Sequence, residues 1–554
     1  MWEQLKQALG QQPDSGDATT RRLVKLLRKH LPSDGYATVV VLTPAVTGSV
    51  EALRDAFPEW SVISAAEDTG NLPERLAARH PIDVIIDADR ADDRRKRFRR
   101  LFYHLTPGGL YVVPGGAGEL GPDPGELGTY LAEAATRPRS ATLRSPGRRS
   151  IAENSLRALR QHVRARGVKD DLVLSHDLPD VRVKLDEPRT NAYLGKSERH
   201  GRVLEVRPAG KAPQLRDYTE GPVRRDPPVD GRIGKSKLSL REYRDAIVGI
   251  EQVVMTDAAI MADSYRHHQR RYLTSRSVVD VAPGFGIPRR RVPAELPRLR
   301  GSYLHLDNEI RGHFGHLMTE TLSRVWSWHA ALEVDPDVKV LLGATRTRPV
   351  VAEWEYGFYE ACGIPRDRIV LIDGYVRVER LLSGTPMFSI PQYVHPGIVD
   401  TWNEVGDRLA AQAAPREWPR RFFVARRTNR RSCTNAADVE RLFAERGFTA
   451  LYPEDYSLYD QVALFRQAEA IGGWCGSGTF HLALVRDPKH LIRIGPVSYQ
   501  PRNELLIAAV RGHRIDDVTC SDVEDDSDRP RFSFNLEREG PYLTSVLERV
   551  GAER

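Results

Sequence analysis

Short apolar runs alternate with amphipathic stretches along the first 150 residues. The runs are rich in β-branched residues and end at turn-forming residues, as buried parallel strands do. They predict strands at 37–44, 60–68, 81–89 and 106–116. Helical patterns such as "SVEALRDAF" and "DDRRKRFRRLFYHL" separate the runs. Strands that alternate with helices in this way predict a doubly wound α/β domain over residues 1–150.

The same alternation returns in the second half of the chain. Strand patterns lie at 339–344, 368–373 and 490–496, and helical patterns lie at 313–332, 350–364 and 459–473. They predict two Rossmann-like lobes, over 231–395 and 396–554. Proline, glycine and charged residues accumulate between 151 and 230, which predicts a connector with an amphipathic helix at 155–167.

Length and composition indicate a globular protein. The chain has 554 residues, 40% hydrophobic and 28% charged, which suits about three domains. No apolar run reaches the roughly 18–20 residues that span a bilayer, and the first residues lack the apolar core of a secretory signal. The four cysteines show no C-x-x-C spacing, so we expect neither a disulfide framework nor a zinc site. We expect a cytoplasmic location, with peripheral contact to the inner face of the cell membrane left open.

Basic residues exceed acidic ones, with a net charge of +7 and a pI of about 9.1. This excess is small for the length, and residues that bind nucleotide phosphates would produce it as well. We therefore expect no nucleic-acid partner. The stretch "PRRFFVARRTNRRS" holds six arginines at 420–431, after a predicted strand. Arginine pairs with phosphate oxygens in bidentate fashion, so the stretch is either a diphosphate-binding segment or a solvated surface.

Two further patterns are candidates for chemistry. His316 and Glu320 are four residues apart, so a helix places them on one face as either an active-site pair or a buried pair that fixes the helix. The segment "CGSG" at 475–478 precedes a predicted helix. It is either a tight turn or an anion site made of backbone N–H groups. Sugar transfer from a nucleotide diphosphate needs a base and positive charge at the departing diphosphate; these segments would supply both.

The N-terminal stretch "DVIIDAD … LFYHLTPGGLYVV" resembles the later strands of class I methyltransferase domains. That family binds S-adenosylmethionine on a glycine-rich turn after the first strand, whereas this chain has "TPAVTGS" there. We expect a degenerate, non-methylating domain in which Glu67 and Asp68 are still able to meet a ribose. Asp87 and Asp89 have the D-x-D spacing of a metal site. We interpret them instead as a carboxylate pair facing water, and expect no metal site.

Residues 230–520 resemble glycosyltransferase family 61, whose bacterial members are often described as capsular polysaccharide biosynthesis proteins. Three blocks, "HFGHLMTETLSRVW", "RFFVARRTNRRSCTNAADVERLF" and "LYPEDYSLYDQVALFRQAEAIGGWCGSGTFH", are similar to the family's blocks and have the same order. The matching positions are His316, Glu320, Leu322, Arg324, Trp326, Arg426, Arg431, Asn435, Pro453, Glu454, Ser457, Gln461, Phe465, Ala468, Gly476 and Gly478. The chain departs from the family pattern at His313, Cys475, Ser477 and His481.

The resemblance implies an inverting, metal-independent glycosyltransferase in which two lobes form a GT-B-like arrangement. It implies a nucleotide-sugar donor, taken here as a UDP-sugar, a glycan or small-molecule acceptor, and no required cofactor. His316 and Glu320 would be catalytic. The donor-binding residues would be Arg426, Arg431, Asn435, Glu454, Gly476, Ser477 and Gly478. Acceptor or sugar contacts would come from His313, Cys475 and His481. The alternatives are a binding protein that has lost catalysis and a bifunctional enzyme with an active methyltransferase domain. The sequence indicates no oligomeric state.

Overall fold

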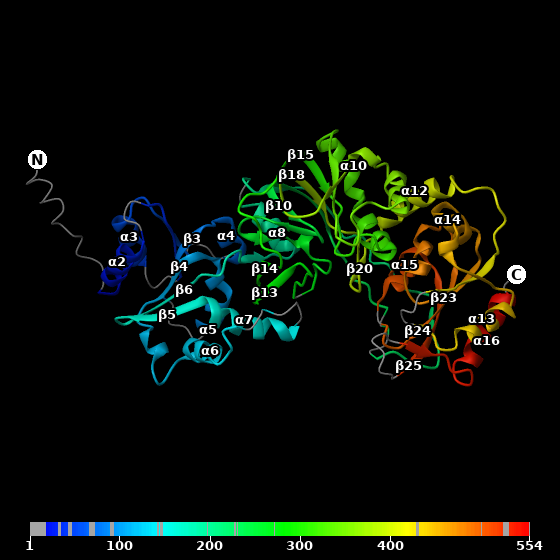
Figure 1. The fold of residues 1–554 in the computed structure, drawn as a ribbon, viewed down its shortest axis with the longest axis horizontal. Coiled ribbons are helices and arrows are strands. Elements are labelled where there is room, and N and C mark those ends of the chain that lie inside the picture. Colours follow the sequence, from blue (N-terminus) through cyan, green and yellow to red (C-terminus); the bar gives the residue numbers. More distant parts are fainter. Residues whose placement is uncertain are drawn as a thin grey trace, which may run out of the picture. The chain divides into compact units, whose positions relative to one another are not determined.

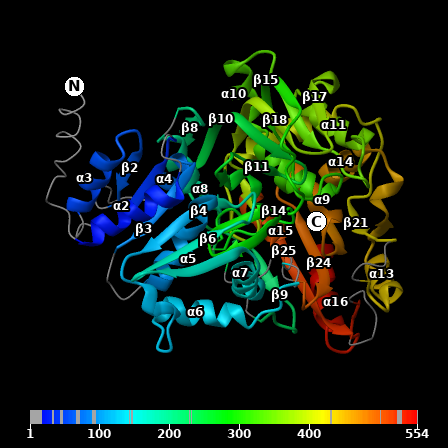
Figure 2. The same cartoon turned by 60° about the vertical axis from the view of Figure 1, so that its left-hand side comes forward.

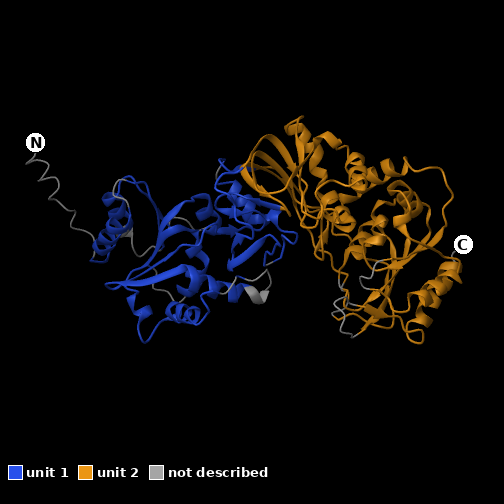
Figure 3. Cartoon of the chain, viewed as in Figure 1, with its two compact units in different colours: residues 1–202, 253–296 blue, residues 203–252, 297–554 orange. Residues whose placement is uncertain are grey.

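In the computed structural model, the chain forms two compact units (Figure 3). Unit 1 comprises residues 1–202 and 253–296, and unit 2 comprises residues 203–252 and 297–554. The residues described are 18–31, 35–42, 47–65, 72–88, 94–140, 143, 148–196, 198–226, 229, 231–270, 272–427, 432–499, 501–523 and 531–552.

Unit 1 contains a six-stranded sheet with the order β2-β1-β3-β4-β6-β5. The strands are β1 (Thr38–Leu42), β2 (Ser61–Ser64), β3 (Ile82–Asp87), β4 (Leu105–Val113), β5 (Val163–Val168) and β6 (Asp171–His176). The first four are parallel, and β6 and β5 add an antiparallel hairpin beside β4. The helices of this part are α2 (Ala18–His30), α3 (Thr47–Ala56), α4 (Leu72–Ala78), α5 (Arg94–Leu101), α6 (Glu126–Ala135) and α7 (Arg148–His162). The α/β class predicted for this region is confirmed (Figure 1).

The structure differs from the predicted connector over residues 151–230. This stretch holds α7, both strands of the β5–β6 hairpin, and more elements beyond them. The predicted helix at 155–167 ends at His162, because the next six residues pair with β6. The apolar run "DLVLSH" fills the place beside β4, where Val112 pairs with Val173.

A smaller part of unit 1 follows the hairpin. It consists of β7 (Arg182–Lys184), α8 (Glu187–Leu194), β11 (Val253–Met255), β12 (Ala259–Ile260), β13 (Val278–Ala282) and β14 (Phe285–Pro288). The strands run in the order β13-β14-β7-β12-β11. Asp186 caps α8, since its carboxylate accepts from the N–H of Arg189, 3.0 Å away.

Unit 2 has two large sheets and a two-stranded antiparallel sheet made of β19 (Phe388–Ser389) and β20 (Tyr393–Val394). The first has the order β10-β18-β15-β16-β17. Its strands are β10 (Leu238–Gly249), β15 (Arg298–His305), β16 (Lys339–Gly343), β17 (Ile369–Ile372) and β18 (Val376–Gly384), with β8 (Gly201–Arg207) paired to β10. The four strands from β18 to β17 are parallel, and β10 is antiparallel to β18.

The second sheet of unit 2 has the order β22-β21-β23-β24-β25-β26. Its strands are β21 (Arg421–Val424), β22 (Thr449–Leu451), β23 (Ala470–Trp474), β24 (His490–Pro496), β25 (Arg514–Val523) and β26 (Arg531–Ser533), with β9 (Tyr218–Glu220) paired to β25. In sheet order, the strands from β22 to β25 are each parallel to their neighbours, and β26 is antiparallel to β25. The longer helices of unit 2 are α10 (Trp326–Val334), α11 (Glu353–Ala361), α12 (Ile398–Ala410), α13 (Ala436–Ala444), α14 (Leu458–Gln467), α15 (Asn503–Arg511) and α16 (Gly540–Ala552).

One apolar core joins the two sheets of unit 2. It includes Leu304 and Leu342 of the first sheet and Phe422 and Ile471 of the second. Trp402 of α12 lies in the same core and is fully buried. Figures 1 and 2 show the helices of unit 2 packed around both sheets. Because burial of apolar surface is the main favourable term in folding, this shared core stabilises the packing of the two sheets within unit 2.

No helix in the described part of the chain is long and apolar enough to cross a membrane.

Candidate functional site

The helix predicted at 313–332 is broken into short turns of different pitch. It begins as α9 (Phe314–His316), continues as a π-helical turn at Leu317–Thr321 and a 3₁₀ turn at Leu322–Arg324, and ends as α10. The hydroxyl of Thr319 donates to the carbonyl of Gly315 at 2.8 Å. Single π-helical turns are frequent at functional sites, and this one contains Glu320.

His316 and Glu320 form a direct pair across this turn. Nδ1 of His316 lies 2.6 Å from Oε1 of Glu320, and the two side chains are only 13% and 10% exposed. The ring of His313, an exposed residue, meets the His316 ring edge-on with centroids 4.9 Å apart. Since Nδ1 is engaged by the carboxylate, Nε2 is the ring nitrogen available for proton exchange with a substrate.

The "CGSG" segment joins β23 to the 3₁₀ helix at Ser477–Leu484. Gly476 has φ 132° and ψ −169°, a conformation that side chains disfavour, which accounts for glycine here. The N–H of Cys475 donates to the carbonyl of Ile494 at 2.7 Å, so the turn is tied to β24. The first N–H groups of a helix have no partner within the helix, and those of Ser477 and Gly478 are therefore suited to an anion.

The first and third sequence blocks meet at this turn. A Cβ placed on Gly315 would lie 2.8 Å from Cβ of Ser477. The rings of Phe314 and His481 stack with centroids 4.7 Å apart. The ring of Phe465 also contacts the ring of His481, with centroids 4.9 Å apart. The segment with the His316–Glu320 pair is thereby packed on the segment with the Gly476 turn.

His481 and Cys475 are both buried beneath the turn. Neither ring nitrogen of His481 has a hydrogen-bond partner among the described residues. Burial lowers the pKa of His481 to about 3, so the ring is neutral at pH 7. Burial likewise raises the pKa of the Cys475 thiol to about 12. Both residues are set inside the packing of the turn, whereas His313 is on the surface.

The second block reaches the turn through Arg426. Its Nη2 donates to the carbonyl of Cys475 at 2.7 Å and lies 3.4 Å from the carbonyl of Trp474. The next residue, Arg427, pairs with Asp455 at 2.7 Å and lies 3.9 Å from Glu454. Glu454 is thus held beside a neighbouring arginine on the surface. Arg431 lies outside the described residues.

Asn435 joins two backbone segments. Its amide nitrogen donates to the carbonyl of Phe534 at 2.9 Å, and its amide oxygen accepts from the N–H of the same residue at 3.1 Å. These two bonds dock the start of α13 on the segment after β26. The predicted donor contact of Asn435 would need a rearrangement of this bridge.

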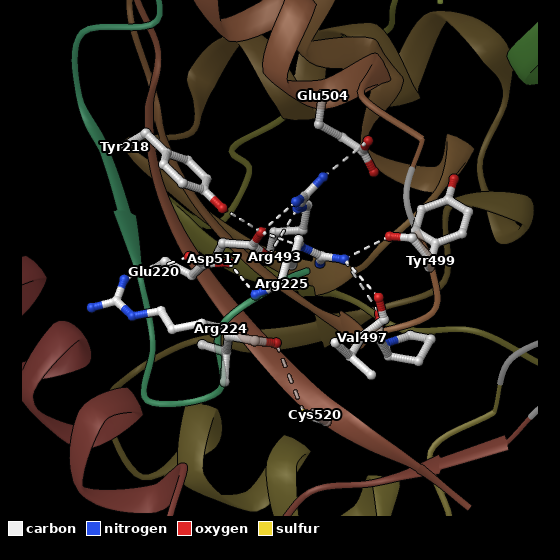
Figure 4. Close-up of polar contacts among 12 residues, drawn as sticks. Tyr218, Glu220, Arg224, Arg225, Arg493, Val497, Tyr499, Glu504, Asp517 and Cys520 are labelled. Carbon is white, nitrogen blue, oxygen red and sulfur yellow. Dashed lines mark hydrogen bonds and ion pairs between the residues drawn. The ribbon is translucent and has the colours of Figure 1, made fainter. Parts of the chain in front are cut away.

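A buried charged cluster behind the turn was not predicted from the sequence. The N–H of Gly476 donates to Oε1 of Glu504 at 2.8 Å, and the second oxygen of Glu504 lies 3.4 Å from Nη1 of Arg493. Arg493 and Arg225 both pair with Asp517, the latter at 3.3 Å (Figure 4). Burial alone would raise the pKa of Asp517, but the two guanidinium groups outweigh it and the pKa is lowered. The one sequence signal was an arginine inside the apolar strand "HLIRIGP".

The N-terminal candidates are only partly described. Asp87 is fully buried and accepts from the hydroxyl of Tyr111 at 2.7 Å and from Nε of Arg97 at 3.1 Å. The interpretation of Asp87 as a carboxylate facing water is therefore wrong, because the strand end is covered. Asp89, Glu67 and Asp68 lie outside the described residues. Within the described ranges, no three His, Cys, Asp or Glu residues gather in a way that could hold a metal ion.

Two solved structures show weak, partial similarity to this chain. MycE methyltransferase from the mycinamycin biosynthetic pathway, in complex with Mg, SAH and mycinamycin VI, is 18% identical with a TM-score of 0.22, over 30% of this chain and 50% of that one. A Staphylococcus aureus structure assigned as a caffeoyl-CoA O-methyltransferase is 14% identical with a TM-score of 0.17, over 30% of this chain and 86% of that one. The chain thus spans about half the length of the first. TM-scores this low establish neither a shared fold nor a shared function.

Comparison with curated proteins gave no match. Residues 314–492 match the family model described as Glycosyltransferase 61. The matched range contains the His316–Glu320 pair, Arg426 and the Gly476 turn, which the fold brings to one region of unit 2. The match supports membership of residues 314–492 in glycosyltransferase family 61.

Proposed function

We propose that the protein is an inverting glycosyltransferase that moves a sugar from a UDP-sugar to a hydroxyl group of a glycan or small molecule. The observation that carries the proposal is the packing of Gly315 on Ser477, which joins a His–Glu pair to the start of a helix, where the first N–H groups have no partner within the helix. The family match over residues 314–492 supports the same class of reaction. The two large, mostly parallel sheets of unit 2 suit a GT-B-like pair of lobes.

In the proposed reaction, the acceptor oxygen attacks the anomeric carbon of the donor sugar. The bond from that carbon to the diphosphate oxygen breaks, its electron pair leaves with UDP, and the anomeric configuration inverts. Nε2 of His316 takes the proton of the acceptor hydroxyl, and Glu320 stabilises the imidazolium that forms. A carboxylate that holds Nδ1 also selects the ring tautomer in which Nε2 accepts a proton.

The departing diphosphate carries the charge that must be stabilised. We assign this role to the N–H groups of Ser477 and Gly478, together with Arg426 and Arg431. A cationic side chain and a helix start supply positive charge in this scheme, so it requires no metal ion. Asn435 and Glu454 are secondary candidates, because their side chains are engaged elsewhere.

The departures from the family pattern bear on whether the chain is active. Cys475 and His481 are buried in the packing behind the turn, so their substitution alters packing more than the groups offered to a ligand. Of the three proposed acceptor or sugar contacts, His313 is the exposed one. This favours catalysis over the alternative of a binding protein that has lost activity.

We further propose that the sugar is transferred in the cytoplasm, for a capsular or cell-surface polysaccharide.

The test is release of UDP from a panel of UDP-sugars, with glycan acceptors and with water. The wild type is compared with His316→Gln and with His329→Gln, the same change at an exposed histidine on α10. We expect turnover with at least one donor, lost in His316→Gln and retained in His329→Gln. Equal turnover in all three proteins would reject His316 as the base.

A further inference from the structure

One peptide unit in the turn is held on both of its edges by opposite charges. The carbonyl of Cys475 accepts from Nη2 of Arg426 at 2.7 Å. The N–H of the same peptide unit, which belongs to Gly476, donates to Oε1 of Glu504 at 2.8 Å. A cation therefore lies at the negative edge of the peptide dipole and an anion at its positive edge, and charge-assisted hydrogen bonds are about twice as strong as neutral ones.

The orientation of this peptide needs such support. Gly476 lacks a Cβ, and glycine accepts φ values of either sign at similar cost. At φ 132° the backbone is outside the range that other residues prefer. Rotation of the peptide would turn its carbonyl toward the carboxylate and its N–H toward the guanidinium. A change in φ of Gly476 that is not offset at ψ of Cys475 would also redirect the chain into the 3₁₀ helix that begins at Ser477.

Glu504 is itself held rigidly. It is 2% exposed, and Nη1 of Arg493 lies 3.4 Å from its second oxygen. Arg493 is 1% exposed and pairs with Asp517 (Figure 4). Asp517 also accepts from Tyr218 at 2.9 Å, and Arg225 joins it from the segment after β9. The carboxylate of Glu504 thus ends a chain of alternating charges that runs through β24 and β25.

We infer that Glu504 is a positioning residue for the donor: it fixes the Cys475–Gly476 peptide and so directs the N–H groups of Ser477 and Gly478 toward the diphosphate. The inference rests on the proposed function, since it assigns the turn to that ligand. Glu504 does not touch the donor in this account. Its contribution passes through one backbone hydrogen bond, the N–H of Gly476.

The test compares Glu504→Ala with Glu504→Gln. Glutamine keeps an oxygen that accepts from Gly476, whereas alanine does not. The matched control is Asp516→Asn, in the residue next to Asp517 on β25. Asp516 is also fully buried, and it pairs with Nε2 of His490 at 2.7 Å and with the hydroxyl of Tyr542 at 2.8 Å. The control therefore disturbs a buried acid of the same strand that lies outside the turn.

Two quantities are measured for each protein: amide hydrogen exchange of the 470–484 segment and the dissociation constant of UDP. We expect Glu504→Ala to accelerate exchange in this segment and to weaken UDP binding at least tenfold. Glu504→Gln should recover part of both, and Asp516→Asn should change neither, although its melting temperature falls.

Unchanged exchange in Glu504→Ala would overturn the inference about the peptide. Faster exchange with undiminished UDP affinity would overturn the link between this peptide and the donor. Faster exchange together with a wild type that binds no UDP would refute the assigned UDP-sugar donor, and with it the role of Glu504 toward that donor.

Discussion

Gly315 and Ser477, which are 162 positions apart in the chain, lie so close that a Cβ at 315 would come within 2.8 Å of Cβ of Ser477. Real Cβ atoms essentially never approach this closely, so the absence of a side chain at 315 is what lets the two segments touch. His316 follows Gly315 directly, and Gly476 precedes Ser477. The proposed base and the proposed anion-binding turn therefore meet at this glycine contact.

Gly315→Ala is expected to destabilise this contact. The added methyl group meets Ser477 Cβ at 2.8 Å and a ring carbon of Phe480 at 3.2 Å, so backbone must shift. Overpacking of this kind costs about 1–3 kcal/mol. We expect a lower melting temperature of unit 2 and a weaker affinity for UDP, measured by thermal unfolding and calorimetry.

A second substitution separates this contact from a general packing defect. Ser477→Gly removes the Cβ that the new methyl group meets, while it keeps the backbone N–H. The double variant Gly315→Ala/Ser477→Gly should regain most of the lost stability. If the double variant is no more stable than Gly315→Ala alone, the contact with Ser477 is not the source of the effect.

His316→Gln should slow transfer strongly while it preserves donor binding. General base catalysis contributes about 10²–10⁴-fold to a rate, and kcat should fall by that factor. Glu320→Gln should have a smaller effect on kcat, because the amide oxygen still accepts from Nδ1 but no longer stabilises the imidazolium. Steady-state kinetics with a UDP-sugar would measure the fall in kcat for each variant. A larger fall in Glu320→Gln than in His316→Gln would contradict the assignment of His316 as the base.

His481 should make stability depend on pH below neutrality. Its pKa is lowered to about 3 in the folded protein, against 6.5 as the ordinary value. Between these values the unfolded chain binds a proton that the folded chain does not, so stability falls as pH falls, by about 1.4 kcal/mol per pH unit at full slope. At pH 5 the loss is roughly 2 kcal/mol.

His481→Phe offers the matched comparison for that loss. A phenyl ring fits the stack with Phe314 and Phe465 and does not titrate. Melting temperatures at pH 7 and pH 5 should diverge less in His481→Phe than in the wild type. Parallel pH dependence in the two proteins would show that the ring of His481 is not the group that titrates.

The sequence predicted the elements better than their junctions. The strands at 339–344, 368–373 and 490–496 were found because each is a continuous apolar run between turn residues. The helix predicted at 459–473 ends at Gln467, since the apolar residues from Ala470 belong to β23. Periodicity does not separate a short buried strand from the end of a buried helix.

Contacts within one helix of the candidate site were predicted from the sequence, and contacts between separate elements were not. His316 and Glu320 are four residues apart, so helical spacing revealed the pair. Glu504 of α15 accepts from the N–H of Gly476, and Arg493 of β24 pairs with Glu504, so the cluster joins separate elements and no local spacing encodes its contacts. The π-helical turn at Leu317–Thr321 was also beyond prediction, because the apolar pattern around it fits an ordinary helix.

The most direct test of the central claim is calorimetric titration of UDP, without added metal, into the wild type and Arg426→Ala. Arg426 supplies a cation at the turn and holds the carbonyl of Cys475 at 2.7 Å. We expect a dissociation constant in the micromolar range for the wild type and at least tenfold weaker binding for Arg426→Ala. A wild type that binds no UDP, or an Arg426→Ala variant with undiminished affinity, would contradict it.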